Sequence, residues 1–199
     1  MDREKEYAEV SSLAIRLRQF LFYVVEVFAY MSYGMIIAGG ALVSYVIGYF
    51  IGFWFVGIGV FIALVIATLI VGKLMVTVRA KPGASKRQSL VFIISFIFAY
   101  AVIPRLFPRP ADYEWYSVIW QLALGVAILV NSIVAYSKHT SLLHLFAGIS
   151  LILSFTVTAY LLFNDLFILS WLFALGSTLL VYFAVAALIL VKGIRVVTG

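Results

Sequence analysis

A run of 46 residues from Val27 to Gly72 contains no Asp, Glu, Lys, Arg or His, and it constrains the fold more than any other feature. A transmembrane helix needs about 20 predominantly apolar residues, so this run predicts two membrane spans joined by a tight turn. Over the whole chain 65% of the residues are hydrophobic and 11% are charged. Soluble domains carry roughly 45–50% apolar and about 25% charged residues. The sequence therefore predicts an integral membrane protein of the cell membrane.

Further apolar segments follow, separated by short polar or turn-forming connections. They predict an all-α fold, a polytopic membrane helix bundle in one domain over residues 1–199, with six transmembrane helices arranged as three hairpins. The predicted spans cover about residues 30–49, 54–72, 90–103, 115–136, 142–163 and 167–191. Residues 4–27 are predicted to form an N-terminal amphipathic helix, because apolar residues recur there at three- and four-residue spacing opposite a polar stripe.

The N-terminal part of the chain allows more than one arrangement. The amphipathic helix either lies in the membrane interface or runs straight into the first span as one long rod. In a competing register, the first span starts near Phe20, bends at Gly39–Gly40 and continues as a re-entrant segment, because broken helices occur at transport sites.

Small residues recur at every fourth position near the end of the first span, at Gly40, Ser44, Gly48 and Gly52. On a helix this spacing makes one shallow groove, and small residues let a second helix approach closely in lipid. These four residues are the predicted helix-packing site. They favour assembly of the chain into a homo-oligomer or with other membrane protein subunits.

The basic residues predict the orientation of the chain. With both termini in the cytoplasm, 12 of the 14 Lys and Arg residues lie on the cytoplasmic side, as the positive-inside rule requires. The net charge of +6 follows this distribution, so it indicates membrane topology and not nucleic acid. The predicted contacts with lipid headgroups or a partner are Arg79, Lys81, Lys86 and Arg87 of the basic connection between the second and third spans.

The second helix of each predicted hairpin carries a Trp, then a Gly five residues later, and ends at a Lys. The three sets are Trp54, Gly59 and Lys73; Trp120, Gly125 and Lys138; and Trp171, Gly176 and Lys192. Two explanations of this pattern are open. Either the three hairpins arose by duplication, or a Trp, a Gly and a Lys in this order are common to any helix that runs from the outer to the inner surface of the membrane.

Few ionisable or strongly polar residues fall near the predicted spans. Glu26 is predicted to lie at the interface beside a basic residue such as Arg18 or Lys5; the alternative is a buried carboxylate on an ion path. His139 and His144 are five residues apart, a poor spacing for two metal ligands on one helix face, so they are predicted to be an interfacial pair.

The functional prediction rests on these polar residues and on what the chain lacks. It has no Cys, no phosphate-cradling glycine loop and no catalytic motif, so no catalytic residue, cofactor or metal ligand is predicted. The leading prediction is a non-enzymatic, helix-packing component of a homo-oligomer or larger membrane assembly. The alternative is a passive channel or transporter for a neutral or weakly polar solute, with Gln121 and Asn131 lining its cavity.

Overall fold

The computed structural model describes residues 2–52, 54–78, 83–106, 112–134 and 141–198. The prediction of an all-α fold is confirmed, since these residues form seven α-helices and no β-strand. The helices are α1 (Asp2–Ile51), α2 (Trp54–Val78), α3 (Gly83–Leu106), α4 (Asp112–Val118), α5 (Trp120–Val134), α6 (Ser141–Phe163) and α7 (Phe167–Thr198).

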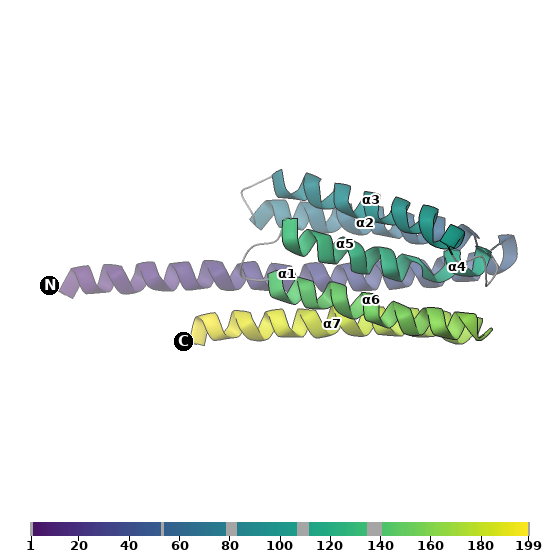
Figure 1. The fold of residues 1–199 in the computed structure, drawn as a ribbon. Coiled ribbons are helices and arrows are strands. Elements are labelled where there is room, and N and C mark those ends of the chain that lie inside the picture. Colours follow the sequence, from purple (N-terminus) through teal and green to yellow (C-terminus); the bar gives the residue numbers. More distant parts are fainter. Residues whose placement is uncertain (1, 53, 79–82, 107–111, 135–140, 199) are drawn as a thin grey trace.

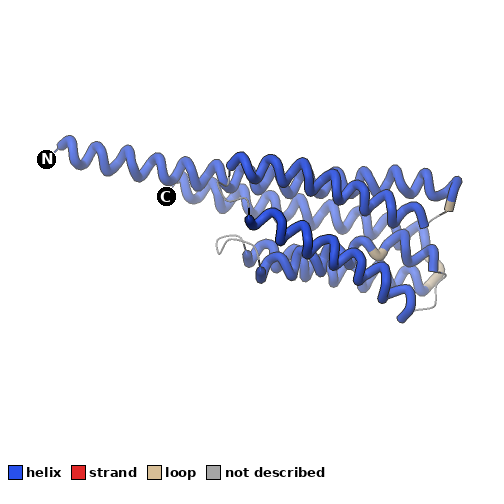
Figure 2. Tube along the Cα trace, turned by 90° about the horizontal axis from the view of Figure 1, so that it is seen from above, coloured by secondary structure: helices blue, strands red, loops and turns tan. Residues whose placement is uncertain are grey.

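The helices lie side by side in one elongated bundle (Figure 1). Helices α1, α3 and α6 run in one direction and α2, α5 and α7 in the other, so both termini lie at the same end (Figures 1 and 2). We call this the terminal end of the bundle and the opposite one the far end. Helix α1 packs along α2 and α7, and α5 packs along α3 and α6, while α6 also packs along α7.

Helix α1 is a single helix of 50 residues. The predicted amphipathic helix and first span are therefore continuous, which is the long-rod alternative. The competing register is wrong, because the helix passes through Gly39 and Gly40 without a break. Its N-terminal part extends beyond the other helices (Figure 1) and leaves apolar side chains such as Leu13 and Ile15 exposed.

Among the described residues, three helical segments are long and apolar enough to cross a membrane: Val10–Ile51, Leu142–Phe163 and Phe167–Thr198. Shorter apolar helices cover Phe55–Val71, Leu90–Leu106 and Trp120–Ile133. Large apolar side chains are exposed along these helices, among them Leu69, Phe98, Ile133 and Leu153. An apolar outer surface of this kind suits a lipid environment, where the hydrophobic effect does not drive helices together.

Several helices extend beyond the predicted boundaries. Helix α2 continues past Lys73 to Val78, and α3 already begins at Gly83, so much of the predicted polar connection is helical. Helix α3 passes through Pro104 and ends at Leu106. A proline there removes a single backbone hydrogen bond from the last turn, where several carbonyls lack helical partners in any case.

The predicted fourth span divides into α4 and α5 at Ile119. Trp115 of α4 is buried, with its ring centroid 5.6 Å from that of Phe163. A turn at Asn164–Asp165 joins α6 to α7. Asp165 has a φ of 59°, a left-handed conformation that Asp tolerates better than most residues.

Glycines set the distances between helices. A Cβ at Gly40 would lie 2.2 Å from the Cβ of Ala63, and a Cβ at Gly59 would lie 1.8 Å from Oγ of Ser44. The groove residues Gly40 and Ser44 therefore face α2 of the same chain. A Cβ at Gly176 would meet no atom within 4 Å, so the glycine of the third predicted repeat is not a packing point.

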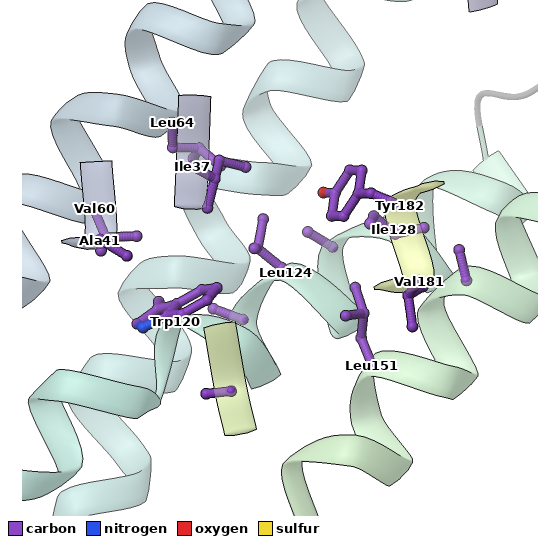
Figure 3. Close-up of a cluster of buried hydrophobic side chains, with 14 of the residues drawn as sticks. Ile37, Ala41, Val60, Leu64, Trp120, Leu124, Ile128, Leu151, Val181 and Tyr182 are labelled. Atoms are coloured by element: carbon purple, nitrogen blue, oxygen red, sulfur yellow. The ribbon is translucent and has the colours of Figure 1, made fainter. Parts of the chain in front are cut away.

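The same close approach fixes α1 against α7. Gly34 faces Tyr182, and Gly193 faces Tyr23, with added Cβ atoms 3.0 and 2.8 Å from the tyrosine Cβ atoms. Between the helices the core is filled by aliphatic and aromatic side chains. Figure 3 shows Leu124 and Ile128 of α5, Leu151 of α6 and Val181 and Tyr182 of α7 gathered in this core.

Candidate functional site

A carboxyl group and an imidazole are buried together in the bundle. Glu26 on α1 and His144 on α6 are each 1% exposed. Both side chains therefore face the interior of the bundle, and their predicted position at the membrane interface stays a prediction. The sequence suggested an interface because Glu26 stands on the polar stripe of α1 and His144 stands near the start of an apolar segment, but neither fact says which way the side chain faces.

Three side chains form this site, which we call the Glu26–Tyr30–His144 cluster. The Tyr30 hydroxyl is hydrogen-bonded to Nδ1 of His144, and the two rings lie nearly parallel with centroids 5.0 Å apart. On the other side of the imidazole, Nε2 lies 3.9 Å from Oε1 of Glu26. The imidazole thus lies between a phenol and a carboxyl group.

The geometry of α1 explains why Glu26 and Tyr30 lie next to each other. Glu26 and Tyr30 are four residues apart on α1, so their side chains lie one above the other on the same helix face. That face is turned toward α6 and α7, because the close contacts of Gly34 and Gly193 fix the rotation of α1 against α7. His144 stands in the first turn of α6, near the terminal end of the bundle.

Two further phenols adjoin the cluster. The Tyr182 ring of α7 lies 5.6 Å from that of Tyr30, centroid to centroid. Tyr23 precedes Glu26 by one turn of α1 and is also buried. Tyr23 and Tyr30 of α1 and Tyr182 of α7 are thus ionisable side chains around the pair of Glu26 and His144.

The cluster can hold and pass a proton. A Tyr30 hydroxyl that donates to Nδ1 leaves the proton of a neutral imidazole on Nε2, the nitrogen that faces Glu26. With one proton on either Glu26 or His144 in addition to that of the neutral imidazole, the pair is neutral overall, either as acid and imidazole or as carboxylate and imidazolium. A second proton, or the loss of the first, leaves a net charge in an apolar core, which is costly. Within the described residues, no group of three His, Cys, Asp or Glu could hold a metal ion.

A second polar cluster joins α5, α6 and α7 toward the far end. Gln121 donates from Nε2 to Oγ of Ser177 over 2.8 Å and accepts at Oε1 from the Thr158 hydroxyl over 2.7 Å. Ser170 donates to the Thr158 carbonyl over 2.9 Å. The side-chain oxygen and nitrogen of Gln121 thus bond neighbouring helices, and its predicted place in the lining of a solute cavity stays a prediction.

The other candidate residues are placed as follows. Asn131 is fully buried on α5. An apolar groove of about 300 Å³ opens between α2 and α3, and neither Gln121 nor Asn131 lines it. Its lining residues are Gly57, Ile58, Phe61, Phe96, Ile97, Tyr100 and Tyr116.

The structure does not describe the side chains of the four predicted basic contacts or of one of the two histidines. Arg79, Lys81 and His139 belong to undescribed segments. Lys86 and Arg87 lie in α3, but their side chains are not described. Gly48 and Gly52 close α1, where the Gly52 amide donates to the Gly48 carbonyl over 2.7 Å.

A sequence signal for His144 did exist. Leu142, Leu143, Leu145 and Phe146 flank it on both sides, which is unusual for a residue in contact with water or lipid headgroups. An ionisable residue within an apolar helix faces the interior of a bundle in almost all cases. No comparable signal pairs His144 with Glu26, since the two side chains belong to helices far apart in the sequence.

Comparisons with protein-family models, with curated proteins and with solved structures found no match for this chain.

Proposed function

We propose that this chain is a polytopic membrane protein that carries protons across the bilayer, with the Glu26–Tyr30–His144 cluster as its proton-binding site. One observation carries the proposal: a carboxyl group and an imidazole are almost completely buried, 3.9 Å apart, in a bundle of apolar helices. Ionisable side chains inside membrane segments are costly and mark ion pathways and proton relays. Histidine suits this role because its ordinary pKa lies in the physiological range.

The proposal includes the topology. Helices α1, α2, α3, α5, α6 and α7 cross the membrane as three hairpins, with both termini in the cytoplasm. Support comes from the placement of the two termini at one end of the bundle (Figure 2) and from the concentration of basic residues at the same end. The cluster then lies in the cytoplasmic half of the membrane.

A structural role is the competing explanation for the cluster. A buried acid–base pair that only holds helices together is often no better than an apolar pair of similar size, and replacement can even stabilise the protein. The two earlier predictions, a helix-packing subunit and a channel for a neutral solute, stay predictions. They have less support, because Gly40 and Ser44 already face α2 of the same chain and Gln121 is hydrogen-bonded within the bundle.

The test is proton movement in proteoliposomes with a pH-sensitive dye inside and an imposed membrane potential. We expect the parent protein to acidify or alkalinise the lumen according to the sign of the potential, and Glu26→Gln to reduce the rate at least tenfold. Glu114→Gln, at an acid of α4 outside the cluster, is the matched control and should keep the parent rate.

A second variant guards against a folding defect. Glu26→Gln leaves His144 without its acidic neighbour, and removal of one partner of a buried pair can be strongly destabilising. The double variant Glu26→Gln/His144→Gln removes both ionisable groups and leaves no lone charge in the core. A parent rate no greater than that of protein-free liposomes would overturn the proposal. A parent rate retained in the folded double variant would overturn it equally.

A further inference from the structure

We infer that α7 supplies the second half of a proton route, in which the Thr178 hydroxyl, together with bound water, connects the Gln121–Thr158–Ser177 cluster to Tyr182 and thereby to the Glu26–Tyr30–His144 cluster. The inference rests on the proposed function and names its path. It starts from the hydrogen-bonding state of the hydroxyl groups inside the bundle.

The Thr178 hydroxyl differs from the other hydroxyls on these helices. Thr178 is fully buried, yet within the described part of the chain its Oγ1 has no hydrogen-bond partner. Serine and threonine in a helix commonly donate to the carbonyl four residues earlier. Ser44, Thr68, Ser154, Thr158 and Ser177 all do so here.

An unpartnered buried hydroxyl calls for an explanation, because buried polar groups in native proteins nearly always bond to protein or to ordered water. Water can occupy such a site only if other polar groups adjoin it. The same face of α7 supplies them. Trp171, two turns toward the far end, is also buried and its Nε1 also has no partner among the described residues. Tyr182 follows Thr178 by one turn toward the terminal end.

The polar groups on this face connect the two clusters. At the far end, Ser170 and Ser177 bond to Thr158 and Gln121. Thr178 is the residue after Ser177, and Tyr182 lies four residues further along. The Tyr182 ring packs on Tyr30, whose hydroxyl bonds to His144. Thr178 and Tyr182 therefore lie between the hydrogen bonds of Ser177 and that of Tyr30.

The row of polar groups along α7, from Ser170 to the level of Glu26, is about as long as the hydrocarbon core of a membrane is thick. The contacts of Gly34 with Tyr182 and of Gly193 with Tyr23 place Glu26 level with residue 190 of α7. From Ser170 to residue 190, the rise of α7 is about 30 Å at 1.5 Å per residue. The hydrocarbon core of a bilayer is also about 30 Å thick. A route with this span reaches from one interface nearly to the other.

The apolar core limits where the route can run. Ile128, Leu151 and Val181 fill the space beside Tyr182 (Figure 3). The polar face of α7 is therefore the route that we assign between the two clusters, and Thr178 stands in its middle.

The experiment compares Thr178→Val, Thr178→Ser and the parent protein in the proteoliposome assay. Valine has nearly the shape of threonine but no hydroxyl, so we expect Thr178→Val to reduce the proton rate at least tenfold and Thr178→Ser to keep it. Thr156→Val is the matched control, because Thr156 is exposed on α6 and its hydroxyl bonds only within its own helix. It should keep the parent rate.

Thermal unfolding in detergent gives a second readout. Since the Thr178 hydroxyl bonds to no described protein group, Thr178→Val should unfold at the parent temperature or above it. A lower unfolding temperature would mean that the hydroxyl holds the protein together and would overturn the inference. Loss of the proton rate in Thr178→Ser as well as in Thr178→Val would also overturn it, because the effect would then be one of shape.

The two proposals fail in different ways. A parent rate in Thr178→Val with a lost rate in Glu26→Gln overturns the route along α7 and leaves the proposed function standing. A parent rate in Glu26→Gln overturns the proposed function itself.

Discussion

Gly39 and Gly40 are neighbours on α1 with opposite surroundings, so the same substitution at the two positions isolates the packing of α1 on α2. A Cβ at Gly40 would lie 2.2 Å from the Cβ of Ala63, whereas a Cβ at Gly39 would meet no atom within 4 Å. Carbon atoms pack best at roughly 3.5–4.0 Å, so Gly40→Ala brings the two methyl groups about 1.3 Å too close. The helices must separate or rotate to accommodate it.

The expected difference in stability follows from two terms. Replacement of a helical glycine by alanine gains about 0.5–1 kcal/mol, and this gain applies at both positions. Overpacking of a well-packed interior costs about 1–3 kcal/mol, and this cost applies only at Gly40. We expect Gly39→Ala to stabilise the protein slightly and Gly40→Ala to lie about 1–3 kcal/mol below Gly39→Ala.

The measurement is thermal unfolding in a mild detergent, followed by loss of the helical circular dichroism signal. For a chain of this size, 1 kcal/mol moves the unfolding midpoint by roughly 2–4 °C, so the two variants should differ by roughly 2–12 °C. Ala63→Gly in the Gly40→Ala background removes the opposing methyl group and should recover most of the loss. Equal midpoints for the two single variants, or no recovery in the double variant, would refute the assignment of this surface to α2. A change in particle mass for Gly40→Ala alone would assign the surface to a second chain.

Two further predictions concern the far end of the bundle. Thr158→Val removes the hydroxyl that donates to Gln121 and should lower the free energy of unfolding by about 0.6–1.7 kcal/mol, whereas Thr158→Ser should stay near the parent value in the same unfolding assay. Burial, and secondly the nearby charge of Asp165, raise the pKa of the Glu114 carboxyl above its ordinary value. The native state then binds a proton more readily than the unfolded state, so stability falls as the pH rises from the ordinary to the raised pKa, and the loss persists at higher pH. Glu114→Gln should therefore unfold at a higher temperature than the parent at pH 7, and the difference should disappear below about pH 4; a difference that is the same at both pH values would contradict the assignment.

Much of the architecture could be predicted from sequence, because it depends on local composition. The boundaries at Trp54, Ser141 and Phe167 fall within one residue of the predicted ones and the boundary at Ile51 within two, since a glycine or a short polar connection separates apolar segments there. The predicted breaks at the polar connection and at Pro104 were less accurate. Polar residues and a proline near a helix end are compatible with further helical turns, so neither sets a sharp boundary.

The candidate site could not be predicted in the same way. Tyr30 and His144 are 114 positions apart, and no local pattern relates them. Glu26 stands on the polar stripe of α1, and in a membrane protein such a stripe faces either the headgroups or the interior of the bundle. The amino-acid pattern is the same in both cases.

Local sequence was enough to predict that the chain is helical and apolar on its outer surface, that α2 begins at Trp54 and that α6 ends at Phe163, because hydrophobic length and turn residues act within a few residues of one another. The tertiary structure alone decided that Glu26, Tyr30 and His144 meet. That meeting depends on the rotation of α1 about its own axis. The rotation is fixed by the close contacts of Gly34 and Tyr23 with α7 and of Gly40 with α2, and such contacts exist only once the helices are packed.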